Sequence, residues 1–506
     1  MPIDHFYRAA QQWPERTAVE VSDEFQEISL SYAELTDRVN ALAAAFQAID
    51  PTPQSRVGVC GYNTLEHLLG LLATYASGKT WVPLNPRNGN DELSRIVDVT
   101  APSIVVVDGD CLDKLDTQLA HVVLGKPDGV SGFDGDTVAN LIVANEGNAP
   151  VRHDLSLDDL QAIKFTGGSS GVPKGVMQTY RVYNTCVATM LAAFEFDADD
   201  RHLLAAPMTH GANTMILPVF AKGGTQLIMG KSNPVAIMDA IERMRATSLF
   251  VPPTVIYMMM ADENIETRDF SSLRHFIVGG AAMRPDAVAQ AMPIFNNAIE
   301  TCFGQTEAPQ IAVCMRAKDW QDPRNYASTG TATLLSQVGI KDPSGKLLAA
   351  GEQGEIVLKG DLVMKGYYKM PDKTAETIID DWLHTGDIGY MDERGYLFIK
   401  DRIRDVVITG GFNVYPSDVE AVLGQHPAVK ECVVFGLPDE KWGEALHAAI
   451  EVHDGEAPSE SEIIGYIKSR LDSVKTPKRV HVVDDLPRSP VGKVLRREAK
   501  VMFAES

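Results

Sequence analysis

The strongest constraint on the fold is the regular alternation of helical and β-branched segments over residues 1–300. Residues 31–34, Ser-Tyr-Ala-Glu, have the spacing of a capping box, and apolar residues then recur on one helical face. Short strands are expected at 57–60 and 103–107, with a leucine-rich helix at 65–77 between them. Because such alternation is typical of parallel sheets covered by helices, the sequence predicts an α/β fold.

A change in character follows between residues 385 and 412. Gly-Asp, Asp-Glu-Arg-Gly and Gly-Gly sequences punctuate short strands there in quick succession. We therefore expect a domain boundary near Lys400. It divides the chain into a large N-terminal domain of layered αβ sheets, 1–400, and a small α+β C-terminal domain, 401–506.

Net charge argues against binding to large polyanions. The chain has 46 Lys and Arg residues against 68 Asp and Glu, which gives a net charge of −22 at pH 7. Such a field repels nucleic acid, although a local basic patch can still hold a phosphate. We expect no nucleic-acid partner.

Cysteine usage and the chain ends indicate a cytoplasmic protein. The six cysteines are scattered without any Cys-x-x-Cys or Cys/His ligand spacing, which favours a reduced compartment and no structural zinc. The first residues are too polar for a signal peptide, and no apolar run is long enough to span a membrane. The last three residues are not a peroxisomal address.

A Gly- and Ser-rich segment at 165–175, Phe-Thr-Gly-Gly-Ser-Ser-Gly-Val-Pro-Lys-Gly, is the strongest local signal. Glycines let backbone N–H groups point inward and the lysine adds a charge, which suits a polyphosphate, but alone the segment also reads as a plain turn. It is not a Walker A loop, because Pro173 precedes the lysine and Gly175 fills the Ser/Thr position. Residues 167–171 fit a Gly-x-Ser-x-Gly hydrolase elbow, yet no good helix start follows.

Four further segments follow in order at 301–307, 382–387, 401–411 and 487–493. They read Thr-Cys-Phe-Gly-Gln-Thr-Glu, Trp-Leu-His-Thr-Gly-Asp, Asp-Arg-Ile-Arg-Asp through Gly-Gly, and Pro-Arg-Ser-Pro-Val-Gly-Lys. Each alone is an ordinary turn or helix start. Together they resemble the AMP-forming acyl-CoA synthetases, the adenylate-forming superfamily that includes firefly luciferase and peptide-synthetase adenylation domains. The resemblance runs over essentially the whole chain.

That resemblance implies a large N-terminal domain joined by a hinge to a small mobile domain. It also implies a reaction in two halves: a carboxylate and Mg-ATP give acyl-AMP and pyrophosphate, and then a thiol displaces AMP. ATP, Mg²⁺ and CoA are the implied cofactors and co-substrates. Because a carboxylate is a weak nucleophile facing a polyanion, the site must neutralise charge before attack at the α-phosphorus.

The resemblance also implies which residues bind ATP. The loop for the β and γ phosphates runs from Thr166 through Gly167, Gly168, Ser169, Ser170 and Gly171 to Lys174. The adenine would lie beside Gly280, Ala281 and Ala282 and pack on Phe303, next to Gly304. Asp387 would accept hydrogen bonds from the ribose hydroxyls, with Arg402 nearby.

Four residues are implied to be catalytic. Thr306 would contact the α-phosphate, and Glu307 would place Mg²⁺, a hard cation that prefers carboxylate oxygen. Lys493 would reach from the C-terminal domain to the carboxylate and the α-phosphate, so the site would be assembled from both domains. His210 would gate the carboxylate.

The sequence departs from the family at two positions. Gly167 stands where a hydroxyl residue is usual, which would loosen the loop or remove one phosphate contact. Arg404 stands at the hinge, where Asp or Lys is common. Arginine keeps the charge of lysine, so we expect domain rotation to be retained, with a carboxylate partner favouring one conformation.

CoA is the expected thiol acceptor, because no carrier-protein domain or pantetheine-attachment pattern is present. Gly410 and Gly411 would line the pantetheine tunnel, with Trp442 near the CoA nucleotide. The basic residues expected at its phosphates are Lys475, Lys478 and Arg479. The sequence leaves two alternatives open: an enzyme that loads a separate carrier protein, and a serine hydrolase built on Ser169.

The acid itself is the least determined substrate. The expected pocket wall, 250–257 with Gly279, contains no charged residue, so an uncharged acyl body is expected. A medium-chain fatty acid and an aromatic or cinnamate-like acid both fit. The oligomeric state stays open between a monomer and a homodimer.

Overall fold

The computed structural model describes residues 1–22, 27–115, 120–127, 130, 132–166, 173–230, 232–453, 455, 458–471, 473–489 and 494–504. They form two compact units, one of residues 1–338 and 358–383 and the other of residues 339–357 and 384–506. This confirms the predicted α/β class with a large and a smaller unit. The boundary near Lys400 stays a prediction.

The larger unit contains a mostly parallel sheet near the N-terminus. Its strands lie in the order β19 (Gly366–Tyr367), β9 (Lys174–Thr179), β8 (Leu160–Thr166), β4 (Thr80–Leu84), β3 (Arg56–Cys60), β5 (Ile104–Val107), β6 (His121–Leu124) and β7 (Asp136–Thr137). The strands from β8 to β7 pair in parallel, whereas β9 pairs antiparallel with β8 and with β19. The expected strands at 57–60 and 103–107 are confirmed as β3 and β5.

A second set of strands in the larger unit carries the nucleotide motifs. Its order is β16 (Gly330–Ala332), β15 (Ala308–Met315), β14 (Ile299–Gln305), β13 (His275–Val278), β12 (Ser248–Val251), β10 (Arg201–Leu203), β11 (Thr225–Met229), β1 (Thr17–Ser22) and β2 (Glu27–Ser31). From β1 to β14 the pairings are parallel, and hairpins close both ends. The carboxyl ends of β12, β13 and β14 therefore lie at one edge, where α/β sheets bind ligands.

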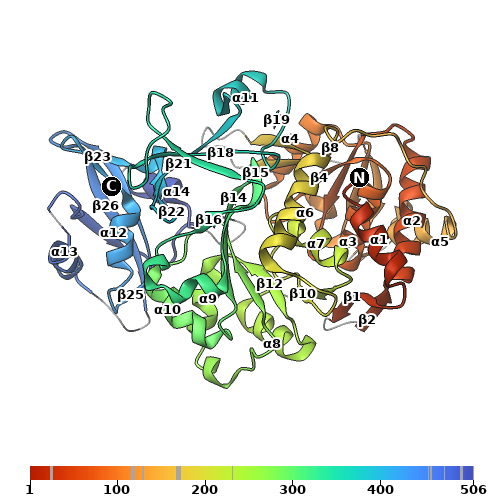
Figure 1. The fold of residues 1–506 in the computed structure, drawn as a ribbon, viewed down its shortest axis with the longest axis horizontal. Helices are drawn as coiled ribbons and strands as arrows, with labels where there is room; N and C mark the ends of the chain where they lie inside the picture. The colour runs from red at the N-terminus through yellow and green to blue at the C-terminus, as the bar shows by residue number, and fades with distance from the viewer. Residues whose placement is uncertain are drawn as a thin grey trace. The chain divides into compact units, whose positions relative to one another are not determined.

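Helices cover both faces of the first sheet. Those of the larger unit are α1 (Asp4–Gln12), α2 (Tyr32–Ile49), α3 (Leu65–Ala76), α4 (Asn90–Thr100), α5 (Val138–Ala144), α6 (Tyr180–Phe194), α7 (Asn213–Ala221), α8 (Pro234–Met244), α9 (Pro253–Met260), α10 (Pro285–Ile294) and α11 (Pro371–Thr377). Helix α3 packs on one face and α4 on the other, while α2 and α5 lie outside α3 (Figure 1). Helix α6 contacts β8, β9 and β15, so it lies between the two sets of strands.

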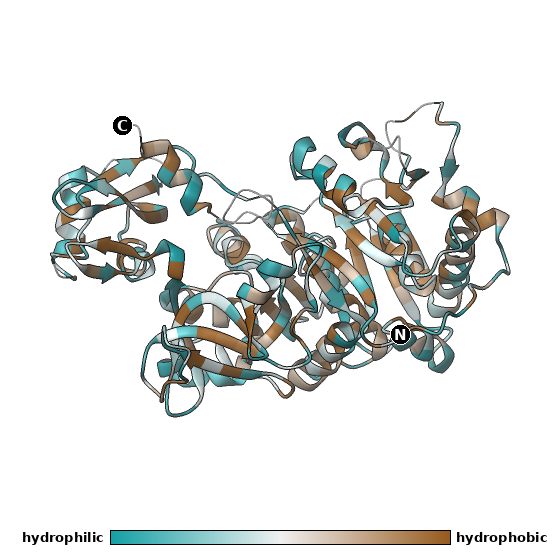
Figure 2. Ribbon diagram, turned by 90° about the horizontal axis from the view of Figure 1, so that it is seen from above, coloured by the Kyte–Doolittle hydropathy of each residue, from teal (hydrophilic) through white to brown (hydrophobic). Residues whose placement is uncertain are grey.

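The predicted capping box is confirmed at the start of α2. Ser31 is the N-cap, its hydroxyl accepts from the Glu34 N–H, and the Glu34 carboxylate accepts from the Ser31 N–H. Both contacts satisfy N–H groups that a helix start leaves unpaired. In Figure 2 hydrophobic residues gather on the strands and hydrophilic ones on loops and outer helix surfaces.

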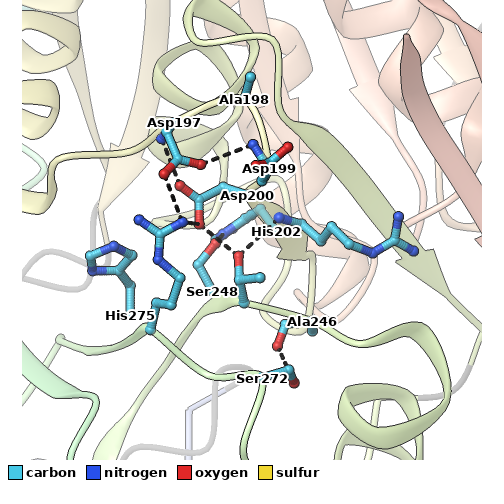
Figure 3. Close-up of polar contacts among 12 residues, drawn as sticks. Asp197, Ala198, Asp199, Asp200, His202, Ala246, Ser248, Ser272 and His275 are labelled. Carbon is cyan, nitrogen blue, oxygen red and sulfur yellow. Dashed lines mark hydrogen bonds and ion pairs between the residues drawn. The ribbon is translucent and has the colours of Figure 1, made fainter.

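A network of polar side chains ties together the strand ends near the Asp197 turn (Figure 3). Asp200, fully buried, accepts from the Thr247 hydroxyl at 2.7 Å, and Arg274 pairs with Asp197 at 2.9 Å. His202 on β10 contacts the Ser248 hydroxyl on β12 at 3.0 Å. Because its buried polar groups are paired with each other, we infer that this network stabilises the fold and is not part of a binding site.

The smaller unit has its own sheet and core. Its strands lie in the order β24 (Phe412–Val414), β23 (Val407–Thr409), β26 (Gly443–Val452) and β25 (Val429–Asp439), with β27 (Arg479–Val482) on β26. Its helices are α12 (Pro416–Leu423), α13 (Glu460–Lys468) and α14 (Arg496–Phe503). The strands β17 (Gln337–Lys341), β18 (Gly354–Lys359), β21 (Trp382–Met391) and β22 (Tyr396–Arg402) are neighbours in that order, and β20 (Ile378–Ile379) pairs with the start of β21. Among the described residues, no helix is both long and apolar enough to cross a membrane.

Candidate active site

The predicted phosphate loop joins the two strands of a hairpin. Thr166 at the end of β8 pairs directly with Lys174 at the start of β9. A Cβ on Gly175 would lie 3.0 Å from side-chain carbons of Ile163 and Phe165. The lack of a side chain at Gly175 therefore lets these two side chains pack against its backbone. The loop residues themselves, Gly167, Gly168, Ser169, Ser170 and Gly171, lie outside the described residues. The described strands thus fix both ends of the loop.

Tyr367 connects Lys174 to Glu307. The Lys174 ammonium lies 4.8 Å from the centroid of the Tyr367 ring, and the Tyr367 hydroxyl donates to Glu307 Oε1 at 2.8 Å. Strand β19 pairs with β9 and so brings this tyrosine beside the lysine. Burial raises the pKa of Tyr367, and the charge of Glu307 raises it further, so the phenol stays a neutral donor. Two motifs far apart in the chain therefore meet around one tyrosine.

The second nucleotide motif lies on the hairpin of β14 and β15. Gln305 pairs with Ala308, so Thr306 and Glu307 form the turn. A Cβ on Gly304 would lie 2.7 Å from backbone atoms of Ala308 and Gln310, so only glycine fits there. Phe303, the expected adenine contact, precedes this glycine on β14 and is half-buried.

Gln178 on β9 joins this turn to the phosphate hairpin. Its Nε2 atom donates to the Thr306 carbonyl at 2.8 Å. Neither Gln178 nor Tyr367 belonged to the predicted site, because no motif marks them. Only the pairing of distant segments reveals their positions.

The segment predicted to pass the adenine follows β13. Gly280, Ala281 and Ala282 are exposed, and Gly280 has φ +86°, a conformation that favours glycine. A Cβ on Gly279 would lie 2.8 Å from the Phe250 ring and 3.0 Å from Cys302 Sγ. The segment thus leaves the sheet at the same edge as the Thr306 turn.

His210 lies just before α7, beside the same edge. Its side chain is exposed, and Nδ1 lies 3.2 Å from the Thr209 hydroxyl. Although the residue keeps exposed surface, the protein packed around its ring lowers the pKa of His210 below its usual value, chiefly by desolvation, and the charges of Lys164 and Arg87 lower it further. His210 is therefore a neutral imidazole at pH 7, able to hydrogen-bond without adding charge.

In the smaller unit, Asp387 and Arg402 form an ion pair. They face each other across β21 and β22, and Arg402 Nε lies 2.7 Å from Asp387 Oδ1. The Asp387 side chain is buried, while Arg402 is partly exposed. Gly386 precedes it with φ +72°, which turns the backbone just before this pair.

The predicted pantetheine glycines form the turn between β23 and β24. Gly410 and Gly411 have φ values of +58° and +84°. The Gly410 N–H donates to the Trp442 carbonyl at 2.8 Å, and a Cβ on Gly410 would lie 3.2 Å from the Trp442 ring. The structure therefore brings all three residues together in one unit.

The basic residues near Trp442 have different partners. Lys441 and Lys478 lie 4.6 and 5.4 Å from the Trp442 ring centroid. Lys475 instead pairs with Asp418 at 2.8 Å, and Arg479 lies 3.8 Å from Glu460. Lys478 is thus the member of the predicted cluster that lies beside the tryptophan.

Lys493 lies outside the described residues, together with residues 490–492. The chain on both sides is held, since Arg488 and Val494 form an isolated bridge. Arg488 also donates to the buried Glu451 at 2.7 Å, and the Leu486 N–H donates to the same oxygen at 2.8 Å. Glu451 thereby anchors the segment that leads to Lys493.

The predicted hinge residue, Arg404, lies in a short 3-10 turn, Ile403–Asp405. Its Nε is 3.7 Å from Asp405 Oδ1, a weak pairing at an exposed side chain. Arg496 on α14 makes shorter contacts on either side of the hinge, at 3.1 Å to Asp401 and 2.9 Å to Asp405. The neighbours of Arg404 are thus held more firmly than Arg404 itself.

A hairpin that frames the predicted phosphate loop, a carboxylate on a nearby turn and a ligand edge on an α/β sheet are the features expected of a nucleotide-binding enzyme. The chain matches the AMP-binding enzyme family over residues 6–368 and the AMP-binding enzyme C-terminal domain over residues 418–493. It belongs to that family, which confirms the resemblance noted from the motifs.

Relatives of known name span almost the whole chain. The medium/long-chain-fatty-acid–CoA ligase FadD8 of Mycobacterium tuberculosis is 32% identical over 94% of this chain and 86% of its own. A feruloyl-CoA synthase of an Amycolatopsis species is 33% identical over 98% of both chains. The ATP-bound structure of MatB from Rhodopseudomonas palustris has a TM-score of 0.90 at 29% identity and covers 100% of this chain and 99% of its own.

Proposed function

We propose that the chain is an ATP-dependent acyl- or aryl-CoA ligase. It activates a carboxylic acid as acyl-AMP with release of pyrophosphate and then transfers the acyl group to CoA. The contact that joins Lys174, Tyr367 and Glu307 carries the proposal, because it unites a polyphosphate loop with a carboxylate on the adjacent turn. Family membership and the named CoA ligases support the same reaction.

These contacts support ATP binding by the larger unit. Lys174 supplies positive charge beside the β and γ phosphates, and its contact with Tyr367 limits where the ammonium can go. The Thr306 hydroxyl meets the α-phosphate on a turn that Gln178 fixes through the Thr306 carbonyl. Both residues reduce the repulsion that an incoming carboxylate meets at the α-phosphorus.

Mg²⁺ fits the carboxylate of Glu307. Tyr367 occupies Oε1, and no described residue donates to Oε2. No group of three or more His, Cys, Asp or Glu side chains among the described residues is arranged to hold a metal ion. That is consistent with Mg²⁺, which is usually held by one or two carboxylates together with substrate phosphates. When bound, the ion would neutralise phosphate charge.

The smaller unit contributes to both halves of the reaction in this proposal. Asp387 accepts from the ribose hydroxyls, while its pair with Arg402 fixes the carboxylate. Lys493 neutralises the charge that develops between the carboxylate and the α-phosphate. The turn of Gly410 and Gly411 beside Trp442 guides the thiol of CoA, and rotation about Arg404 exchanges these two surfaces.

The test is a pyrophosphate-release screen over a panel of carboxylic acids, with and without CoA. We expect acid-dependent pyrophosphate release, and an acyl-CoA product when CoA is present. A thioester formed only on a pantetheinylated carrier protein would instead make the chain a carrier-loading enzyme. Reaction with a fluorophosphonate probe at Ser169, without ATP, would identify a hydrolase.

A further inference from the structure

Lys164 is a buried lysine outside the motifs described above. It lies on β8 two residues before Thr166, and because side chains alternate along a strand it shares a face with Thr166 and Lys174. Its side chain is 6% exposed. The ammonium lies 5.2 Å from the Trp81 ring centroid, 5.6 Å from that of Tyr183 and 3.3 Å from Asn213 Oδ1.

The hydrogen-bonding capacity of Lys164 is largely unused. Lys79, another buried lysine of this unit, donates to the Asp50 carbonyl, the Thr52 carbonyl and the Ser55 hydroxyl. An ammonium has three such donors. Among the described residues, Lys164 makes one hydrogen bond, a long one to Asn213.

The charge of Lys164 also lacks a counter-ion. No carboxylate among the described residues pairs with it, and its neighbours are a neutral amide and two aromatic rings. Burial lowers its pKa to about 8, so most molecules still carry the proton at pH 7. The nearby thiol of Cys186 supplies no negative charge, because burial raises its pKa to about 12. A buried charge of this kind is costly unless something pairs with it.

A small cavity adjoins this lysine. Helices α6 and α7 line it with Tyr183, Cys186, Val187, Asn213, Thr214 and Leu217, and Gln178 and Pro309 complete the wall. Of these lining residues, Tyr183 and Asn213 also contact the ammonium of Lys164, which does not itself line the cavity. The cavity also borders the active site, since Gln178 holds the Thr306 carbonyl and Pro309 follows the Glu307 turn.

Like the expected acyl wall, 250–257 with Gly279, the cavity wall has no charged residue, and its polar members include Gln178, Asn213 and Thr214. Gln178 Oε1 is buried and has no partner among the described residues. A water molecule in the cavity would satisfy hydrogen bonds, but it would leave the charge of Lys164 uncompensated. A substrate carboxylate would accept from the Lys164 ammonium and compensate its charge, and a substrate carbonyl would accept the hydrogen bond alone. Gln178 Oε1, itself an acceptor, would still take its hydrogen bond from water or another donor.

We infer that Lys164 is a recognition residue for a second oxygen acceptor, a carboxylate or carbonyl group on the acyl body of the acid, which enters the cavity between α6 and α7. The cavity is small, so the end of the substrate that enters it is a small polar group rather than a ring. This inference rests on the proposed function and narrows its substrate class. The pocket wall alone suggested an acid with an uncharged acyl body, whereas Lys164 favours an acid that carries a second oxygen group far from the reacting carboxylate.

Matched acids provide the test. Hexanoate is compared with adipate and 5-oxohexanoate, and benzoate with terephthalate and 4-acetylbenzoate, together with longer members of each aliphatic series. The readout is kcat/KM for acid-dependent pyrophosphate release. For the wild-type protein we expect at least one oxygen-bearing acid to exceed its unsubstituted partner by about tenfold or more, because an unpaired buried donor penalises the partner that lacks the acceptor.

Two variants attribute this preference to Lys164. Lys164→Met keeps the length of the side chain without its charge, and Asn213→Asp provides an internal carboxylate at the position where the ammonium already makes its hydrogen bond. We expect both to lose the preference for the dicarboxylate while keeping the activity with unsubstituted acids. Should Lys164→Met fail to fold, Asn213→Asp still decides the question, because it retains the lysine.

Two results would overturn the inference: a wild-type protein that shows no preference within any pair, or a preference for the dicarboxylate that survives in either variant that folds. Failure of the proposed function looks different, because the wild-type protein would then release no pyrophosphate with any acid of either kind. Activity with unsubstituted acids alone would therefore reject the recognition site and leave the ligase.

Discussion

Tyr367 is the residue on which the proposed phosphate site depends most directly. Its ring faces Lys174 while its hydroxyl binds Glu307, so one side chain orients both charged groups. Tyr367→Phe keeps the ring and removes the hydrogen bond. We expect kcat/KM for ATP to fall by about 10- to 150-fold, since one lost hydrogen bond to a charged group is worth about 1.5–3 kcal/mol.

The neighbouring Tyr368 provides the control for this prediction. Tyr368→Phe removes a hydroxyl from the next residue, whose ring faces Lys369. Steady-state rates of pyrophosphate release at varied ATP concentration should therefore change little in that variant. Equal effects of the two substitutions would show that Tyr367 does not orient Glu307.

Lys164 also has a cost in stability that can be measured. Its pKa is lowered from 10.5 to about 8 by burial, which corresponds to about 3 kcal/mol of disfavoured protonation in the folded state. The unfolded chain binds this proton more tightly, so stability rises with pH between those two values. We expect Lys164→Met to increase the free energy of unfolding at pH 7 by up to about 3 kcal/mol.

Denaturant unfolding of the wild-type protein and of Lys164→Met across a pH series checks this prediction. The stability that Lys164→Met gains over the wild type should shrink as pH rises from 8 towards 10.5. Above that range the lysine is neutral in both the folded and the unfolded protein. A variant that is less stable than the wild type at pH 7 would show that the aromatic rings and Asn213 already compensate the charge. A group that destabilises the fold is most simply understood through what it binds.

At the scale of elements, the turn between β23 and β24 is predicted to guide the thiol. Gly411 has φ +84°, and a Cβ there would meet no atom within 4 Å in this unit. Gly411→Leu therefore meets no clash at Cβ, but leucine rarely adopts this φ, so the variant combines backbone strain with a side chain that projects from the turn. We expect thioester formation to slow at least about tenfold more than acyl-AMP formation, because only the second step needs the thiol path.

Gly395 offers a matched control, since it lies in another turn with φ +81° and no atom within 4 Å of a Cβ. Rapid-quench measurement of both half-reactions for Gly411→Leu and Gly395→Leu separates a blocked path from backbone strain. Equal slowing of the two half-reactions in Gly411→Leu would count against a thiol path at this turn.

Patterns of adjacent residues predicted the helices and strands well, but they did not predict which distant segments pair with each other. The capping box at Ser31 and the β-branched run of β5 were readable, because a helix cap and a buried parallel strand each depend on adjacent residues. Strand β19 has two residues and no pattern, so no local signal predicts that Tyr367 lies beside Lys174. Lys164 could have been singled out from the sequence, because it is a lysine within the otherwise mostly apolar strand Leu160–Thr166.

At the scale of the whole molecule, the proposal divides the two half-reactions between two surfaces of the C-terminal domain. Lys493 is needed while charge builds up between the carboxylate and the α-phosphate, and it has no role once acyl-AMP exists. We expect Lys493→Ala to lose nearly all acyl-AMP formation, yet to convert supplied acyl-AMP and CoA to thioester at a rate near that of the wild type.

Arg488→Ala is a useful companion variant, because Arg488 pairs with the buried Glu451 beside the Lys493 segment. We expect it to slow the first half-reaction only, and by less than Lys493→Ala does. Rapid-quench rates for the two separate half-reactions decide the matter. If Lys493→Ala slowed both steps equally, the proposed division of labour would be wrong.

If the acid is activated as an adenylate, one of its own oxygen atoms must be transferred to AMP, and isotopic labelling can follow that atom. A carboxylate labelled with heavy oxygen is incubated with the wild-type protein, ATP, Mg²⁺ and CoA, and the products are analysed by mass spectrometry. Attack of the labelled oxygen on the α-phosphorus followed by displacement by the thiol leaves one labelled oxygen on AMP and none on pyrophosphate. Label in inorganic phosphate, or a thioester formed with unlabelled AMP, would contradict the adenylate mechanism.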